Sequence, residues 1–196
     1  MTVPARDDLA AVLDSVSDLI GGVEDKQWSA PTPCPEWDVR LLVNHMVLGH
    51  RLFTGILRAT TTASPGALDP STDDVLGDNP TDAYRRATND VLAAFAQPGV
   101  LEQEFHVPAG VAPGIAAVHL RAVEELAHGW DLARATDQRP PFPHDVVERH
   151  LEFTRTKLAD MPPDQSPFAP PQPVPDDAPP LDRLAALLGR RTDPRR

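Results

Sequence analysis

The chain has 196 residues, with 18 Lys and Arg against 29 Asp and Glu, and a formal net charge of −11. This length is typical of one domain with an extension, and the acidic balance argues against a nucleic-acid binder, which needs a basic face. The single cysteine excludes a scaffold held by intramolecular disulfides. No apolar run has the length of a signal peptide core or a membrane span, so we expect a cytoplasmic protein that does not bind membranes.

Apolar residues spaced three and four apart predict five long helices, followed by a weaker helical piece at 181–188. Residues 60–80 are rich in Thr, Ser, Asp, Gly and Pro and predict a long loop, while 101–107 could be a strand or an extended connector. Strand signals are otherwise almost absent, so the pattern favours an all-α bundle. The five predicted helices cover residues 9–20, 38–57, 80–98, 114–135 and 145–158.

The prolines mark a change along the chain, because 12 of the 23 lie between Pro140 and Pro180. We therefore predict a helical core over residues 1–161 and a proline-rich C-terminal extension over 162–196. Composition alone is typical of a disordered tail. The interspersed Phe168, Val174 and Leu181 indicate instead a segment packed along the bundle, as part of the same domain.

Several common catalytic motifs do not occur. The sequence has no phosphate-binding Gly-x-x-x-x-Gly-Lys loop, no Gly-x-Gly-x-x-Gly, no Gly-x-Ser-x-Gly elbow and no His-Glu-x-x-His pair. These absences argue against nucleotide-dependent enzymes and hydrolases of the corresponding types.

Histidine and glutamate placement offers a different chemistry. Glu124 and His128 are four residues apart and project from one side of a predicted helix, and His45 lies within the most apolar predicted helix. Together they form a His-Glu-His set, the donor types that zinc uses when it keeps an open position. Asp131 could orient one imidazole ring. His50 lies about 140° around the helix from His45 and cannot share its ligand face.

A simpler interpretation also explains these residues. Arg121, Glu124, His128 and Asp131 could be a solvated stripe of ion pairs, each worth a few tenths of a kcal/mol. His45 could be a core histidine with a hydrogen-bond partner. Spacing alone does not decide between the two interpretations.

Longer motifs give a resemblance. Four segments resemble an actinobacterial family of the DinB-like metal-binding superfamily, related to the N-terminal domain of mycothiol-dependent maleylpyruvate isomerase. These segments are residues 33–40 (PCPEWDVR), 43–45 (VNH), 128–136 (HGWDLARAT) and 173–184 (PVPDDAPPLDRL). The resemblance implies a DinB-like four-helix bundle with an extra C-terminal helix, and a divalent metal, most commonly zinc, on His45, Glu124 and His128.

The same resemblance implies a function. In the related enzymes the metal activates mycothiol as a thiolate, so we expect a metal-dependent thiol transferase or isomerase acting on an electrophilic small molecule. The isomerase has a further C-terminal domain, for which residues 137–196 are too short. The alternative is a non-catalytic bundle that binds a metal or a small molecule. A homodimer is expected by analogy, and no catalytic residue is assigned.

Other side chains receive structural interpretations. Cys34 has no basic neighbour in sequence and is interpreted as a loop residue, while Trp37 and Trp130 are interpreted as packing residues. Arg51 and Arg121 could engage an anionic substrate, although nothing selects them over other arginines. Four histidines without a paired donor are expected at the surface: His106, His119, His144 and His150.

Overall fold

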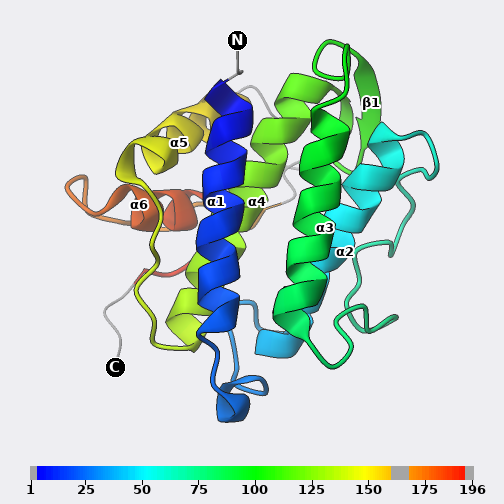
Figure 1. Cartoon of the computed structure of the whole chain (residues 1–196). Coiled ribbons are helices and arrows are strands. Elements are labelled where there is room, and N and C mark those ends of the chain that lie inside the picture. The colour runs from blue at the N-terminus through cyan, green and yellow to red at the C-terminus, as the bar shows by residue number, and fades with distance from the viewer. Residues whose placement is uncertain (1–3, 160–167, 193–196) are drawn as a thin grey trace.

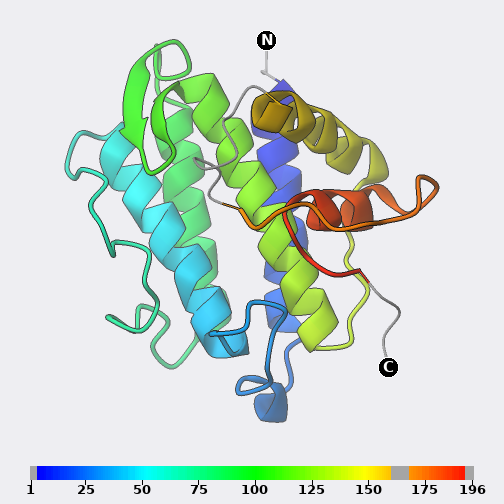
Figure 2. The same cartoon turned by 180° about the vertical axis from the view of Figure 1, so that it is seen from behind.

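The computed structural model describes residues 4–159 and 168–192, and its core is a bundle of four helices (Figure 1). These are α1 (Pro4–Gly21), α2 (Val39–Leu57), α3 (Pro80–Phe95) and α4 (Gly114–Ala135). Helix α1 packs against α3 and α4, and α2 packs against the same two helices. Each helix of the bundle therefore has two neighbours, with α1 and α3 on one side and α2 and α4 on the other (Figures 1 and 2).

Three further helices and a hairpin complete the described fold. They are the 3-10 turn η1 (Asp25–Gln27), α5 (His144–Ala159), α6 (Pro180–Leu187) and an antiparallel pair of strands, β1 (Glu104–Val107) and β2 (Gly110–Pro113). The all-α prediction is thus confirmed, and the segment left open as strand or connector contributes β1. The first helix begins five residues earlier than predicted, at Pro4, and α3 ends at Phe95.

Local sequence explains where two bundle helices begin. The Asp38 carboxylate accepts a hydrogen bond from the backbone N–H of Leu41, at 2.9 Å, and so caps α2. Asn79 caps α3 in the same way through the N–H of Asp82, at 3.1 Å. These caps satisfy N–H groups that have no partner within their own helices.

Buried apolar side chains form two clusters, one on each side of α4. The larger lies between the bundle helices, while the smaller joins Val123 and Leu126 of α4 to Leu151 of α5 and Leu184 of α6. Figure 2 shows the described part of the C-terminal extension crossing α4. Residues 160–167, at the predicted boundary between core and extension, lie outside the described residues.

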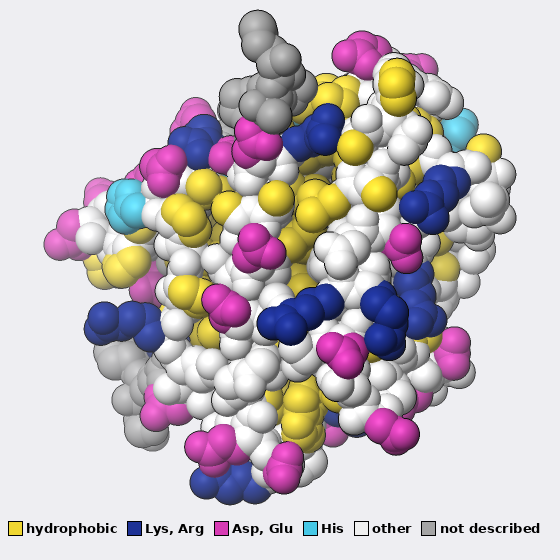
Figure 3. Space-filling model, in the orientation of Figure 1, with side chains coloured by type: hydrophobic (Ala, Val, Ile, Leu, Met, Phe, Trp, Pro, Cys, Tyr) yellow, Lys and Arg dark blue, Asp and Glu magenta, His cyan; other side chains and the backbone are white. Residues whose placement is uncertain are grey.

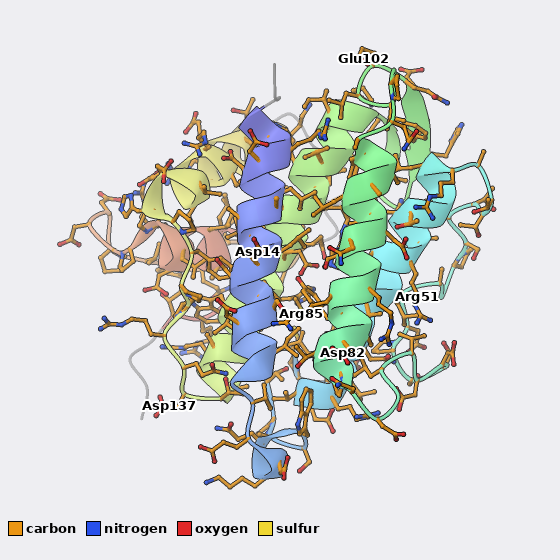
Figure 4. All side chains as sticks on the ribbon, in the orientation of Figure 1. Asp14, Arg51, Asp82, Arg85, Glu102 and Asp137 are labelled. Carbon is orange, nitrogen blue, oxygen red and sulfur yellow. The ribbon has the colours of Figure 1, made fainter. Side chains whose placement is uncertain are left out.

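The face formed by α1 and α3 carries charges of both signs, and hydrophobic side chains reach its surface between the two helices (Figure 3). Arg85 of α3 points towards α1 (Figure 4), where its Nε donates a hydrogen bond to Ser17 Oγ at 2.9 Å. Within the described residues, no helix combines the length and the apolar character needed to cross a bilayer.

Gly114, the first residue of α4, has no room for a side chain, because a Cβ there would overlap the carbonyl oxygen of Val100. We expect Gly114→Ala to lower the free energy of unfolding by about 1–3 kcal/mol, because neither backbone can move without disturbing the hairpin or α4. Urea unfolding measures the loss. Gly21→Ala is the control, since a Cβ there meets no atom within 4 Å. Equal stability of the two variants would contradict the packing at Gly114.

Candidate metal centre

The three side chains named by the sequence come together where α2 and α4 pack. His45 on α2 and Glu124 and His128 on α4 each offer a donor atom, and these atoms all lie within 4.8 Å of one another. The two imidazole centroids are 5.0 Å apart. Glu124 Oε2 lies 3.5 Å from His128 Nε2. One divalent ion could therefore be reached by all three residues.

The His45 ring is oriented by the loop that follows α2. Its Nδ1 lies 2.8 Å from the carbonyl oxygen of Leu68. Because a carbonyl only accepts, Nδ1 carries the proton and Nε2 keeps its lone pair for another partner. The buried Asn44 holds the loop: its amide donates to the carbonyls of Pro70 and Asp73, and its Oδ1 accepts the N–H of Val75.

The His128 ring is oriented by a buried carboxylate. Its Nδ1 lies 3.1 Å from Asp131 Oδ2, so its Nε2 faces Glu124. The predicted contact between Asp131 and a ring is thus confirmed. Asp131 is itself completely buried and is held by Arg190 from the C-terminal extension, whose Nη2 lies 3.0 Å from Oδ2. A carboxylate behind a histidine is the usual arrangement around metal-binding imidazoles.

Electrostatics favour the metal-binding forms of two of the three residues. Burial and the neighbouring His128 lower the pKa of His45 to about 4, which leaves it neutral near pH 7. Burial alone would raise the pKa of Glu124, but the hydrogen bond and charge of His128 outweigh it and lower that pKa to about 2. Burial lowers the pKa of His128, yet hydrogen bonds to Asp131, Cys34 and Glu124 raise it well above its usual value. A metal would therefore displace a proton from His128.

A second donor group shares His128 but is less suited to a cation. Cys34, His128 and Asp131 also lie within 4.8 Å of one another, and Cys34 Sγ is 3.3 Å from Asp131 Oδ2. The Arg190 guanidinium already places a positive charge on both oxygens of Asp131. A metal ion there would have to displace that charge. Cys34 lies in the loop before α2, as interpreted, and the extension brings a basic group to the carboxylate that Cys34 contacts.

The alternative of a solvated stripe on α4 is wrong. Arg121 is 3% exposed, His128 7% and Asp131 not at all, so three of its four members are buried. Arg121 instead pairs with the buried Glu125 at 2.5 Å. The charge of Arg121 is thus balanced within the bundle, whereas Arg51 is exposed.

Glu125, which the sequence did not single out, is the centre of a buried network. Its carboxylate accepts a hydrogen bond from the Tyr84 hydroxyl at 2.6 Å and lies 3.1 Å from His50 Nε2. The i, i+4 spacing with Arg121 was the available signal, although it predicts only a weak surface pair. The network fixes α2, α3 and α4 to one another close to the candidate ligands.

Trp37 and Trp130 pack as predicted, and Trp37 also contacts the candidate ligands. The Trp37 ring lies 4.4 Å from the His45 ring and 6.0 Å from the His128 ring, measured between centroids. Trp130 faces the extension, where its Nε1 donates to Asp182 at 2.7 Å. Trp37 therefore forms a wall of the site, and Trp130 helps to dock α6.

Four histidines were expected at the surface, and His106 and His144 are indeed exposed. The prediction is wrong for His150, which is completely buried, and His119 is half-buried. His119 and His150 face each other across α4 and α5, with their Nδ1 atoms 3.4 Å apart. The pairing of α5 with α4 encloses His150, and the polar sequence of α5 gives no sign of this.

The chain is a four-helix bundle that carries a candidate His-Glu-His metal site, and comparison with known proteins identifies its family. The family model described as the mycothiol maleylpyruvate isomerase N-terminal domain matches residues 9–133. The chain therefore belongs to this family. This confirms the resemblance from the sequence motifs.

Relatives and solved structures agree with the assignment. The uncharacterized protein Rv0738 of Mycobacterium tuberculosis is 32% identical over 178 residues, covering 90% of this chain and 92% of the relative. Its counterpart in the CDC 1551 strain has the same identity and coverage. The crystal structure of the mycothiol-dependent maleylpyruvate isomerase matches with a TM-score of 0.61 and 16% identity, covering 77% of this chain and 70% of that chain. A mutant of that enzyme gives a TM-score of 0.62. These structures support the fold.

The burial of His150 predicts a pH dependence of stability. Burial and the charge of His119 lower its pKa from 6.5 to about 4; Arg149 also lowers it, and Asp8 opposes them. The unfolded chain therefore binds a proton at His150 below about pH 6.5, whereas the folded chain binds this proton only below about pH 4. We expect stability contributed by a neutral His150 to be complete above pH 6.5 and to fall by on the order of 3 kcal/mol as the pH approaches 4.

Urea unfolding at pH 5 and pH 7 tests this dependence. His150→Leu should lose less stability between the two pH values than the unmodified chain, because the leucine does not titrate. His144→Leu, an exposed position on the same helix, is the control and should retain the full pH dependence. An unchanged pH dependence in His150→Leu would contradict the assignment.

Proposed function

We propose that this protein binds one divalent metal, zinc by its donor chemistry, on His45, Glu124 and His128, and uses it to activate mycothiol. The observation that carries the proposal is the convergence of three donor atoms within 4.8 Å, with both imidazole rings fixed through Nδ1. Two nitrogens and a carboxylate oxygen suit zinc and leave coordination positions for a further ligand. Membership of a family named for a mycothiol-dependent enzyme supports the identity of the thiol.

Each residue has a distinct role in this proposal. His45 and His128 supply neutral nitrogen donors, and Glu124 supplies a negative charge. Asp131 orients His128, while Trp37 shields one side of both rings from water. When bound, the metal would lower the pKa of a coordinated thiol so that the thiolate, the nucleophilic form, prevails near neutral pH.

The proposed reaction class is thiol transfer or isomerisation on an electrophilic small molecule. Thiolate addition to such a compound precedes either outcome, and the difference lies in whether the thiol is later released. A non-catalytic metal-binding bundle is the second candidate. It is favoured by one observation, which is that the structural match covers 70% of the solved isomerase and not the whole of that enzyme.

Metal content tests the first part of the proposal. After zinc loading and dialysis, the unmodified chain should retain about one zinc ion. His45→Ala and Glu124→Gln should each retain far less, because two ligands hold zinc poorly. His106→Ala, at an exposed position, is the control and should retain the full amount. Absence of bound metal, or full retention by His45→Ala, would contradict the site.

Mycothiol binding then separates the two candidate functions. Calorimetry should show binding to the zinc-loaded chain and none to His45→Ala. A chain that holds zinc but does not bind mycothiol would be assigned to the non-catalytic class.

Asp131→Asn tests the orienting role of the buried carboxylate. The amide cannot offer His128 and Arg190 two charged acceptor oxygens, so we expect zinc affinity to fall about 10- to 100-fold. Competition with a chromophoric chelator measures this affinity, and unfolding of the metal-free variants separates it from general destabilisation. Asp14→Asn, an exposed carboxylate of α1 (Figure 4), is the control and should leave zinc affinity unchanged. Unaltered affinity in Asp131→Asn would refute the role.

A further inference from the structure

A mostly apolar pocket of about 220 Å³ lies beside Glu124. It is bounded by α2, α4, α5 and Phe168 at the start of the described extension. Because Glu124 is both a wall of this pocket and a candidate metal ligand, a molecule in the pocket would lie next to the metal centre. Its other apolar walls are Phe53, Leu68, Leu120, Val123, Phe153 and Leu158.

Most polar groups in the pocket walls already have partners. Thr154 Oγ1 donates to the carbonyl of His150 at 2.7 Å. The positive charge of Arg121 is balanced by Glu125, while its buried Nε–H has no hydrogen-bond partner among the described residues. That N–H is one donor for a ligand oxygen, but Arg121 brings no net charge to the pocket.

Lys157 is the cation that remains for a ligand. It is exposed at the rim, and its Nζ lies 5.9 Å from the Phe153 ring centroid. In the described parts of the chain, no carboxylate forms an ion pair with it. The pocket thus has a carboxylate at the metal end, apolar walls and one positive charge at the rim.

The volume of the pocket and the charges at its walls determine which ligands it can bind. At the roughly 30 Å³ that a water molecule occupies in the liquid, the pocket holds about seven non-hydrogen atoms. An apolar body of that size gains free energy from leaving water. A single anionic group would reach Lys157. A second anionic group would be desolvated against apolar side chains and close to Glu124, which is costly.

We propose that this pocket receives the electrophilic substrate, and that the substrate has a small apolar body with one negatively charged group rather than two. The inference rests on the proposed function, because it places the electrophile next to a thiol held at the metal. It deepens that function by assigning the substrate class and two residues, Leu120 and Lys157, that select it.

Unreactive carboxylates of defined length are suitable probes. Butanoate, hexanoate and adipate are titrated into the zinc-loaded full chain, and dissociation constants are read from NMR shifts. Affinity should rise about fourfold per methylene between butanoate and hexanoate. Adipate, which has the same six carbons but two charges, should bind at least about tenfold more weakly than hexanoate. Equal or tighter binding of adipate, or no dependence on chain length, overturns the proposal.

Two variants locate the binding in the pocket, each with a matched control. Leu120→Trp fills the pocket and should weaken hexanoate at least about tenfold, whereas Leu92→Trp on α3, also half-buried, should not. Lys157→Gln should weaken hexanoate but not neutral hexanol, and Arg155→Gln, an exposed cation on the same helix, should change neither. Unchanged hexanoate binding in both pocket variants overturns the proposal.

Zinc content of the same samples separates this proposal from the proposed function. The pocket is formed by protein side chains, so its preference for hexanoate over adipate can be measured in the zinc-free chain as well. If the chain binds zinc and mycothiol but does not prefer hexanoate over adipate, only the proposed substrate class is contradicted. If the chain prefers hexanoate but does not bind zinc, only the proposed metal function is contradicted.

Discussion

The hydrogen bond between Asp131 and His128 connects the parts of the molecule on which the candidate metal centre depends. Asp131 lies on α4, yet its oxygens also contact Cys34 from the loop before α2 and Arg190 from the C-terminal extension. Three distant segments therefore meet at one buried carboxylate. A buried negative charge is stable only with such partners, so the orientation of His128 depends on the docking of the extension.

The extension is thus part of the site and not a separate appendage. Trp130 donates a hydrogen bond to Asp182 of α6, and Arg190 contacts Asp131, so the extension contacts two consecutive residues of α4. Phe168, nearer the start of the extension, lines the pocket beside Glu124. The same segment therefore stabilises the orientation of His128 and also bounds the pocket beside Glu124.

Helical periodicity was sufficient to predict the bundle, because the apolar positions of its helices recur at helical spacing. Glu124 and His128 could be paired from their i, i+4 spacing, and His45 could be grouped with them by donor type, but only the family resemblance favoured a metal site over a core histidine. Arg190 and Glu125 could not be predicted in the same way. Their contacts join residues far apart in the chain, and Arg190 reaches its partner only through the path of a proline-rich segment. His150 was misjudged because its helix looks polar and its burial depends on where α5 docks.

Two donor groups meet at His128, and we propose that the metal uses His45 and Glu124 while Arg190 keeps it away from Cys34 and Asp131. X-ray absorption of the zinc-loaded protein tests this directly. We expect nitrogen and oxygen scatterers at about 2.0–2.1 Å without thiol, and one sulfur scatterer at about 2.3 Å once mycothiol is added. A sulfur ligand present before the thiol is added would indicate Cys34 coordination and contradict the proposed ligand set.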